Sequence, residues 1–226
     1  MKTSVLFSNL DSETLRGMLA DYRREIWPKG GHLPSAQVAD LFTVVISGRV
    51  ELRRTNPLTG RQMTLFLLGP GDAFDVIALL DGHDHETQPV AVEPLEIITA
   101  PIASVRRWIE RHPSFNRSFL PHLGQRMREL EDLSADLALS ETVTRLAKLI
   151  IQQATPESEQ IIGEPPPTPL INTLSDEAMA RMIGSVRAVV NRHLQDFIQR
   201  GLISTSHGKL VVHDLAKLKE HCERLL

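Results

Sequence analysis

Several side chains between residues 185 and 192 have the chemistry and the spacing to bind nucleic acid. Arg187 can donate two hydrogen bonds to O6 and N7 of a guanine, and Asn191 and Arg192 follow about one helical turn later. Such residues on one helical face would meet base edges and phosphates in the major groove of DNA. The residues predicted to contact DNA are Ser185, Arg187, Ala188, Asn191, Arg192 and Lys209.

The stretch 174–202 contains the elements that would position these side chains. Its apolar residues fall at helical spacing in two short segments, which predicts two helices joined by a turn. Gly184 suits the positive φ of that turn, Val190 would fill the space between the helices, and Gly201 would end the second helix. The pattern is typical of a helix-turn-helix, with an ordinary αα-hairpin as the alternative.

A small β-hairpin is predicted to follow. Residues 203–205 and 210–212 are β-like, and His207-Gly208 forms a turn between them. Helix, turn, helix and hairpin in this order predict a winged DNA-binding domain. Two alternatives concern single residues: Arg192 could pair with Asp196 on the helix surface, and Lys209 could be only a solvated wing tip.

The composition restricts the class of protein. The chain has 226 residues, of which 42% are hydrophobic and 23% charged. Residues from 170 onward carry eight basic and six acidic side chains, a net charge of +2, whereas the remainder carries −5. This asymmetry permits DNA binding. Neither a signal peptide in Met1 to Asn9 nor an apolar run near the roughly 18 residues of a membrane span is found, so a cytoplasmic protein without membrane contact is expected.

Other site chemistry is not supported. The single cysteine, Cys222, excludes a four-cysteine zinc site and an iron–sulfur cluster of the usual kind. His83-Asp84-His85-Glu86 offers metal-ligand side chains, but an exposed polar loop is the favoured interpretation, and no third ligand cluster lies nearby in the sequence. No phosphate loop, nucleophile elbow or zinc-hydrolase helix is found. We therefore expect no metal site and no enzyme.

The N-terminal part is predicted to be a small β domain. Residues 10–24 have helical spacing behind Asp11-Ser12 as a cap. Strand-like segments then cover residues 41–46, 50–53, 63–68 and 90–98, separated by turns that contain glycine or proline. Short strands at this spacing indicate a sandwich or barrel.

The spacing becomes helical from residue 102 to residue 138. Leu123, Met127, Leu130, Ser134 and Leu137 step by 4, 3, 4 and 3 residues, as in a coiled-coil seam. We predict a parallel helix dimer with Leu123, Met127, Leu130 and Leu137 at the interface, with a core-facing stripe as the alternative. A helix at 141–153 and a proline-rich loop at 155–169 follow. The predicted domains are residues 1–110, 111–138 and 139–226.

These elements and their local sequences resemble one family over almost the whole chain. The residues that carry the resemblance are the segment 41–50, Pro70-Gly71-Asp72, Arg145-Leu146-Ala147, Ile183-Gly184-Ser185-Val186-Arg187, Asn191-Arg192-His193-Leu194 and Gly201-Leu202-Ile203. The family is the cyclic-AMP receptor and fumarate–nitrate regulator superfamily of bacterial transcription factors. The resemblance implies an α+β fold: a β-roll sensor, a jelly-roll-like double-stranded β-helix, then a long dimerisation helix and a C-terminal winged helix-turn-helix. It also implies a homodimer on a two-fold symmetric operator, with RNA polymerase as a further candidate partner.

The sensor departs from the cyclic-AMP branch of this family. That branch has a Gly-Glu pair after the Gly-Asp turn, where Asp75-Val76 stands here, and an Arg-Ser pair about ten residues later, where His85, Glu86 and Thr87 stand. The acidic residues nearby would repel a phosphate, so cyclic AMP is not the expected effector. The iron–sulfur branch is excluded by the cysteine count. The carbon-monoxide-sensing haem branch has cysteine and histidine where Asp75 and Ile77 lie.

The sensor looks most like that of the cyanobacterial global nitrogen regulators, which bind 2-oxoglutarate. The resemblance covers residues 74–82 and implies an effector site of Phe74, Asp75, Val76, Ile77, Arg126 and Glu131. The β-roll arginine of that site is missing, and an ordinary ion pair is the favoured interpretation of Arg126 with Glu131. The effector therefore stays unknown.

The sequence as a whole predicts a homodimeric, sequence-specific DNA-binding transcription regulator whose β-roll senses a signal other than cyclic AMP. The alternatives are a ligand-binding sensor that regulates a protein partner without DNA, and a β-roll enzyme. The lack of a paired base and nucleophile disfavours the enzyme. Salt-dependent DNA binding would distinguish the regulator from the sensor of a protein partner.

Overall fold

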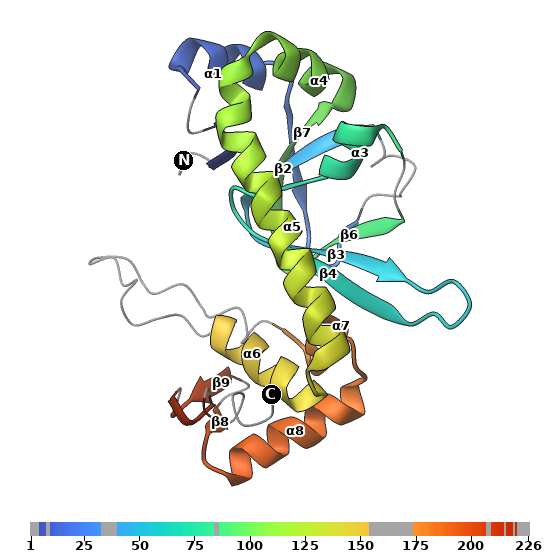
Figure 1. The fold of residues 1–226 in the computed structure, drawn as a ribbon, viewed down its shortest axis with the longest axis vertical. Coiled ribbons are helices and arrows are strands. Elements are labelled where there is room, and N and C mark those ends of the chain that lie inside the picture. The colour runs from blue at the N-terminus through green and yellow to red at the C-terminus, as the bar shows by residue number, and fades with distance from the viewer. Residues whose placement is uncertain are drawn as a thin grey trace. The chain divides into compact units, whose positions relative to one another are not determined.

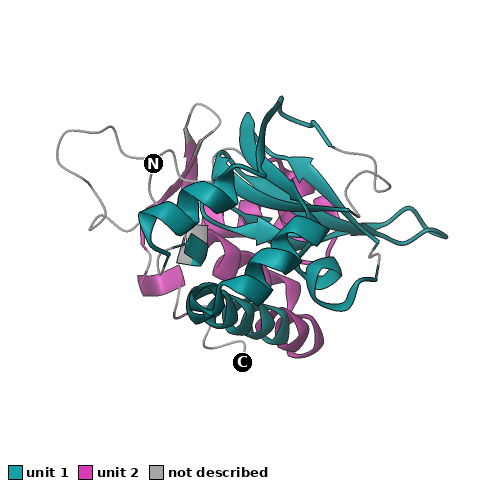
Figure 2. Ribbon diagram, turned by 90° about the horizontal axis from the view of Figure 1, so that it is seen from above, with its two compact units in different colours: residues 1–131 teal, residues 132–226 magenta. Residues whose placement is uncertain are grey.

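A computed structural model describes residues 5–7, 10–32, 40–83, 86–153, 174–206, 209–214, 216–218 and 220. The chain divides into two compact units, residues 1–131 and residues 132–226. Figure 1 labels the helices and strands, and Figure 2 colours the two units. The predicted loop at 155–169 and the wing turn His207-Gly208 lie outside the described residues.

The first unit is built on two antiparallel sheets. The four-stranded sheet has the order β1-β7-β2-β5, from Arg23–Trp27 (β1), Leu95–Pro101 (β7), Leu41–Ser47 (β2) and Ala73–Phe74 (β5). The three-stranded sheet has the order β4-β3-β6, from Gln62–Leu68 (β4), Val50–Thr55 (β3) and Thr87–Ala91 (β6). The predicted strands at 41–46, 50–53 and 63–68 are confirmed.

The segment 90–98, predicted as one strand, is two. β6 pairs with β3 in one sheet, and β7 pairs with β2 and β1 in the other, so the chain changes sheets between Ala91 and Leu95. Gly48 allows this crossing, because a Cβ atom there would lie 2.3 Å from the Pro94 carbonyl oxygen. Side chains from both sheets fill the space between them: Trp27, Val45, Val50, Leu52, Leu68, Phe74, Ala91, Leu95 and Ile97. The two-layer β domain that the sequence predicts is therefore present.

The N-terminal helix is shorter than predicted. Helix α1 covers Ser12–Leu19, and the Asp11 carboxylate caps it by accepting hydrogen bonds from the backbone N–H groups of Glu13 and Thr14, at 3.0 and 2.9 Å. The prediction of a helix to residue 24 is wrong at its end, because residues 23–27 form β1. Only Trp27 of this strand is buried, so β1 lacks the apolar alternation that indicates a strand.

The helical stretch predicted for residues 102–138 is interrupted. Helix α4 covers Ile102–Arg111, a 3-10 turn (η2) covers Pro113–Phe115, and helix α5 covers Asn116–Leu139. His112 has φ −126° and ψ 79°, because a residue before proline avoids the helical region. Phe115 and Phe119 stack with ring centres 5.1 Å apart and pack with residues of α1 and α4 in a second core cluster.

Among the residues that the structure describes, the second unit contains the end of α5, further helices and a hairpin. These are Thr142–Gln153 (α6), Asp176–Met182 (α7), Arg187–Gln199 (α8), Ile203–Ser206 (β8) and Lys209–Val212 (β9). β8 and β9 pair antiparallel, which confirms the predicted wing. Leu146, Ala147 and Ile150 of α6 and Val190 and Phe197 of α8 are fully buried. Apolar faces at helical spacing thus hold the second unit together.

Candidate nucleic-acid interface

Helix α7 begins and ends at residues suited to those positions. The Ser175 hydroxyl accepts a hydrogen bond from the Ala178 N–H at 3.2 Å, and Asp176 and Glu177 lie in the first turn, where acidic side chains interact favourably with the helix dipole. Ala178, Met179 and Ala180 are buried. The small Ala180 therefore lies in the interior of the second unit.

The turn after α7 is closed by backbone hydrogen bonds. The Ser185 N–H donates to the Ala180 carbonyl at 2.8 Å, and the Gly184 N–H donates to the Arg181 carbonyl at 3.4 Å. This pair of bonds is a Schellman motif, which needs a left-handed residue after the helix. Gly184 supplies it with φ +63°. The predicted role of Gly184 is confirmed, and the turn gives α8 a fixed starting direction.

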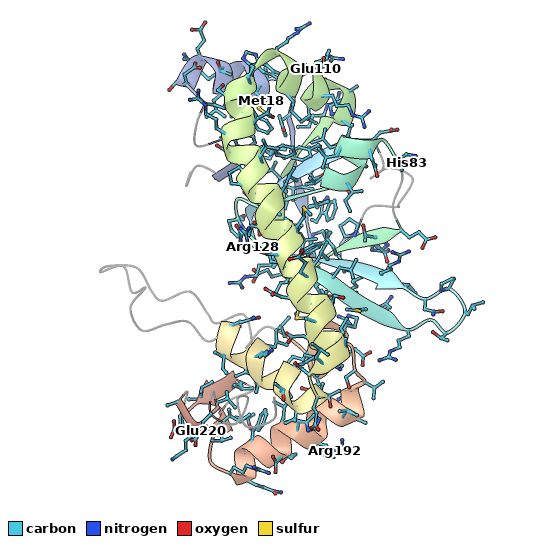
Figure 3. The ribbon with its side chains drawn as sticks, in the orientation of Figure 1. Met18, His83, Glu110, Arg128, Arg192 and Glu220 are labelled. Carbon is cyan, nitrogen blue, oxygen red and sulfur yellow. The ribbon has the colours of Figure 1, made fainter. Side chains whose placement is uncertain are left out.

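The N-terminal half of α8 exposes most of the predicted DNA-contacting residues. Arg187, Ala188 and Arg192 are exposed, whereas Ser185 and Asn191 are half-buried. Val190 is fully buried between the helices, as predicted. Arg192 projects from α8 in Figure 3. Val186 precedes the helix without a side-chain capping bond, because valine has no polar side-chain atom.

The acidic side chains near Arg187 and Arg192 leave both arginines available to contact DNA. Arg187 Nε lies 4.0 Å from an Asp176 carboxylate oxygen, and the Arg187 side chain is 66% exposed. Asp196, the alternative partner for Arg192, forms an ion pair with Arg200 at 2.9 Å. Such exposed pairs contribute roughly 0 to 1 kcal/mol, so they compete weakly with a phosphate or a base.

His193 links α8 to α6. Its Nε2 atom lies 2.9 Å from the Thr142 hydroxyl at the start of α6. Burial lowers the pKa of His193 below the ordinary imidazole range, and the charge of Arg192 lowers it further. No local pattern indicates this contact, because the two residues are 51 positions apart in the sequence.

The wing is the hairpin of β8 and β9, and the structure describes the backbone of both strands. β8 and β9 pair in the register Ile203 with Val212 and Ser206 with Lys209. The His213 Nε2 atom lies 2.7 Å from the Ser204 hydroxyl and links the hairpin to the residue after it. The position of the Lys209 side chain lies outside what the structure describes, so its predicted phosphate contact stays a prediction.

The predicted effector residues from the β-roll do not share one exposed surface. Phe74 belongs to the core between the sheets, and Asp75 is buried with a left-handed φ of 64°. Val76 and Ile77 begin helix α3 (Val76–Asp81), where Val76 packs against the core and Ile77 is 55% exposed. Arg106 holds the end of α3 by donating to the Ala78 and Leu79 carbonyls, both at 2.8 Å.

Arg126 is engaged with carboxylates other than Glu131. Its guanidinium pairs with Asp72 of the Gly-Asp turn and with Glu129, the latter at 2.7 Å, and lies 5.9 Å from the centre of the Phe66 ring. The Arg126 side chain is only 16% exposed, whereas Glu131 is exposed. Asp72 was recognised in the sequence only as a turn residue, because a contact across 54 positions leaves no local pattern.

His122 is a buried polar residue close to Arg126, Asp72 and Glu129 that the sequence did not indicate. It is buried on α5, and its Nε2 atom has no hydrogen-bond partner among the described residues. Burial lowers the pKa of His122, and Arg126 lowers it further, while Asp72 and Glu129 act in the opposite direction. Together these residues connect the β-roll to the first half of α5.

The predicted dimer stripe on α5 is partly exposed. Met127 is 64% exposed, and Leu130 and Leu137 are 38% and 37% exposed, whereas Leu123 packs partly against the core. Leu120, seven residues before Met127, is 61% exposed and extends the stripe, although the sequence prediction omitted it. Exposed leucine and methionine at this spacing form an apolar face on a helix.

Two other expectations concern metals and membranes. Within the described residues, no group of three or more His, Cys, Asp or Glu side chains could hold a metal ion. Asp84 and His85 of the loop considered for metal lie outside these residues. None of the described helices combines the length and the apolarity that a bilayer crossing requires.

Comparison with known proteins agrees with this arrangement. A cyclic nucleotide-binding domain model matches residues 34–112, and a Crp-like helix-turn-helix domain model matches residues 144–221. The chain is 30% identical to a cyclic AMP receptor protein of Thermus thermophilus over 222 residues, 97% of each chain. It is 29% identical to a global nitrogen regulator of Synechocystis sp. over 186 residues, 80% of each chain.

A solved structure shares the fold. A mutant of CooA from Carboxydothermus hydrogenoformans superposes with a TM-score of 0.75 at 24% identity, covering 98% of this chain and 97% of that one. The cyclic nucleotide-binding β domain precedes the helix-turn-helix domain in this chain, as the matches to the two domain models show. The chain therefore belongs to the cyclic-AMP receptor and fumarate–nitrate regulator superfamily, and it is a CRP-like transcription regulator with a helix-turn-helix DNA-binding domain.

Proposed function

We propose that this regulator binds a two-fold symmetric operator as a homodimer, with the N-terminal half of α8 in the major groove of each half-site. One observation carries the proposal. Arg187, Ala188 and Arg192 are exposed at the start of α8, directly after a turn that is closed by its own hydrogen bonds. A recognition helix contacts base edges with these first residues.

Each residue of this surface has a proposed role. Arg187 donates to a guanine, Arg192 contacts a base or a phosphate, and Asn191 contacts either. Ser185 and Lys209 contact phosphates, which orient the domain without conferring sequence preference. Ala188 has no acceptor for a cytosine amino group, so the base pair opposite it is weakly specified or biased to thymine, whose methyl group it can touch.

The apolar stripe of α5 supports the homodimer. Members of this regulator class are typically dimeric, and Met127, Leu130 and Leu137 present apolar surface at heptad spacing. A parallel pair of α5 helices would remove this surface from water. It would also give the two recognition helices the two-fold relation that a symmetric operator needs. RNA polymerase is the further partner expected of a regulator that acts at promoters.

The proposed effector is a small molecule other than cyclic AMP. Val76 stands where a ribose-binding glutamate would be expected, and the region lacks an arginine for a cyclic phosphate. Phe74, Asp75, Val76, Ile77, Arg126 and Glu131 remain the candidate effector residues. An anionic ligand at Arg126 would compete with Asp72 and Glu129 for the guanidinium.

Selection of binding sites from random duplex DNA by the purified full-length protein tests the DNA proposal. We expect an inverted repeat, two protomers per duplex in sedimentation, and an affinity that falls as the salt concentration rises. Selection of a single non-repeated site, or one protomer per duplex, would contradict the homodimer. If the protein binds no DNA even at low salt, DNA binding is contradicted and regulation of a protein partner is favoured.

Calorimetry with cyclic AMP tests the effector proposal. Without a phosphate-binding arginine, we expect affinity no better than millimolar, or about −4 kcal/mol. The curated cyclic AMP receptor relative of Thermus thermophilus is a suitable positive control under the same conditions. Micromolar binding by this protein would show that its β-roll accepts a cyclic nucleotide through other residues.

A further inference from the structure

Arg145 begins the Arg145-Leu146-Ala147 motif, which neither the DNA surface nor the effector residues explain. In the structure its guanidinium donates to four main-chain carbonyl groups. Nε reaches the Ile183 carbonyl at 2.9 Å, and Nη1 reaches those of Ser140, Asp136 and Leu137 at 2.8, 3.1 and 3.3 Å. Three of these carbonyls belong to the end of α5 or the residue after it, and the fourth belongs to the turn before α8.

The carbonyls of Leu137 and Ser140 lie at the end of α5 and just beyond it, whereas the Asp136 carbonyl also accepts the Ser140 N–H at 3.0 Å. The last carbonyls of a helix have no intrahelical donor, and hydrogen bonds from a charged donor are about twice as strong as neutral ones. Ile183 is the residue after α7, immediately before Gly184. A single side chain on α6 therefore connects the end of α5 to the turn that determines the direction of α8.

Two further contacts join the same parts of the second unit. Lys148 of α6 forms an ion pair with Asp136 of α5 at 2.5 Å, with both side chains about two-thirds buried. A Cβ atom at Gly184 would lie 2.6 Å from Leu137 Cδ2, so α5 approaches the turn closely. The end of α5 is thus held to α6 and to the turn independently of Arg145.

Helix α6 also holds the recognition helix itself. The Thr142 hydroxyl contacts His193 of α8 at 2.9 Å, one turn before Arg145 along α6. Leu146, Ala147 and Ile150 are fully buried on the same helix. Helix α6 is therefore fixed to the end of α5 on one side and to α8 on the other.

We propose that Arg145 is a positioning residue that fixes α8 relative to the last turns of α5 and thereby sets the half-site spacing that the dimer accepts. The inference rests on the proposed homodimer, because spacing has meaning only for two linked recognition helices. A residue needed only for folding would affect all operators alike. A positioning residue would change the preference among spacings.

The test uses duplexes that carry the selected half-sites at the wild-type spacing and with one or two base pairs added or removed. The variants are Arg145→Gln and Lys148→Gln in the full-length protein. Arg200→Gln is the matched control, because it removes a cation from an exposed ion pair of the same unit without touching α5. Binding to a duplex with a single half-site reports whether the winged helix is intact in each variant.

We expect the wild type and Arg200→Gln to prefer one spacing strongly. Arg145→Gln should bind that spacing roughly tenfold more weakly, as expected from the loss of charge-assisted hydrogen bonds, while it loses much of the preference among spacings. Lys148→Gln should show the same change to a smaller degree. Both variants should keep wild-type binding to the single half-site and the wild-type base preference.

Uniform weakening at all spacings by both variants, or a spacing preference equal to that of the wild type, would overturn the inference while the proposed function stands. If Arg145→Gln fails to bind the single half-site because it does not fold, Lys148→Gln alone decides the question by the same criterion. Failure of the wild type to distinguish two half-sites from one would overturn the proposed homodimer and the inference with it.

Discussion

Two helical arginines, Arg187 in the second unit and Arg126 in the first, differ in their availability to a ligand. Arg187 is 66% exposed, and an Asp176 carboxylate oxygen lies 4.0 Å from its Nε atom. Arg126 is 16% exposed, pairs with Asp72 and Glu129, and lies over Phe66. Arg187 can meet a new anionic partner without losing a strong contact, whereas Arg126 must exchange partners. The difference explains why the proposed DNA surface is easier to identify in the structure than the proposed effector site.

The same difference suggests how the two units respond to a ligand. DNA can bind the exposed start of α8 with little rearrangement inside the second unit. A ligand at Arg126 would disturb the contacts that join α5 to the β-roll. If the proposed effector binds there, it would change which side chains hold the long helix, and such a site is suited to transmit a signal.

The largest effect is expected from charges on the α5 stripe. Met127→Asp or Leu130→Asp would bury a carboxylate in an apolar helix interface, so we expect monomers in sedimentation equilibrium. Arg128→Asp is the matched control, because it places the same carboxylate on α5 outside the stripe. Dimers of unchanged stability in both stripe variants would refute this interface.

A smaller but substantial effect is expected at Gly184. Gly184→Ala would combine an unfavourable positive φ with a Cβ atom 2.6 Å from Leu137, and we expect a loss of about 3 kcal/mol from the stability of the second unit. Gly201→Ala is the control, since Gly201 has φ +68° but open space around its Cβ position. Denaturant unfolding should show the difference. Equal losses in the two variants would mean that Leu137 moves aside at no cost.

Removal of each of the two arginines tests the comparison directly. Arg126→Ala would leave a partly buried Asp72 without its cation, and we expect a loss of about 1 to 2 kcal/mol in unfolding free energy. Arg187→Ala should change the unfolding free energy by less than about 0.5 kcal/mol, because its side chain is exposed. Urea unfolding of both variants measures this. An equal cost for the two would show that Arg126 is as available as Arg187.

The smallest effect is expected from two histidines, one in each unit. Burial lowers the pKa of both His122 and His193, with Arg126 and Arg192 as the next causes. The unfolded chain therefore binds protons that the folded chain does not, and stability should fall as the pH drops below about 6.5. Unfolding measured between pH 7.5 and 5.5 tests this. His122→Gln and His193→Gln should each reduce the slope, and an unchanged slope in both would assign it to other groups.

The sequence predicted elements well where the pattern is local. The helix-turn-helix followed from apolar spacing and from Gly184, and the strands at 41–46, 50–53 and 63–68 followed from their turns. Strand β1 was missed because only Trp27 among its residues is buried. The change of sheet between β6 and β7 was missed because it depends on how Pro94 packs against Gly48.

The candidate sites divide in the same way. Arg187, Ala188 and Arg192 are placed by the geometry of one helix, so their exposure could be predicted. The partners of Arg126 and the four carbonyls around Arg145 come from distant positions, and no spacing in the sequence indicates them. Contacts of this kind depend on tertiary packing, which a single sequence does not reveal.

The most direct test of the account is binding-site selection by the wild type beside Arg187→Ala, Ala188→Glu and Lys209→Ala. Arg187→Ala removes a bidentate arginine–guanine contact. We expect it to lose about 1 to 3 kcal/mol of binding free energy and the preference for one guanine in each half-site. Ala188→Glu should introduce a cytosine preference at the position that Ala188 faces, because it supplies the missing acceptor. Lys209→Ala should weaken binding to all DNA sequences about equally and reduce the salt dependence of the affinity. An unchanged half-site selected by Arg187→Ala would contradict the placement of α8 on DNA.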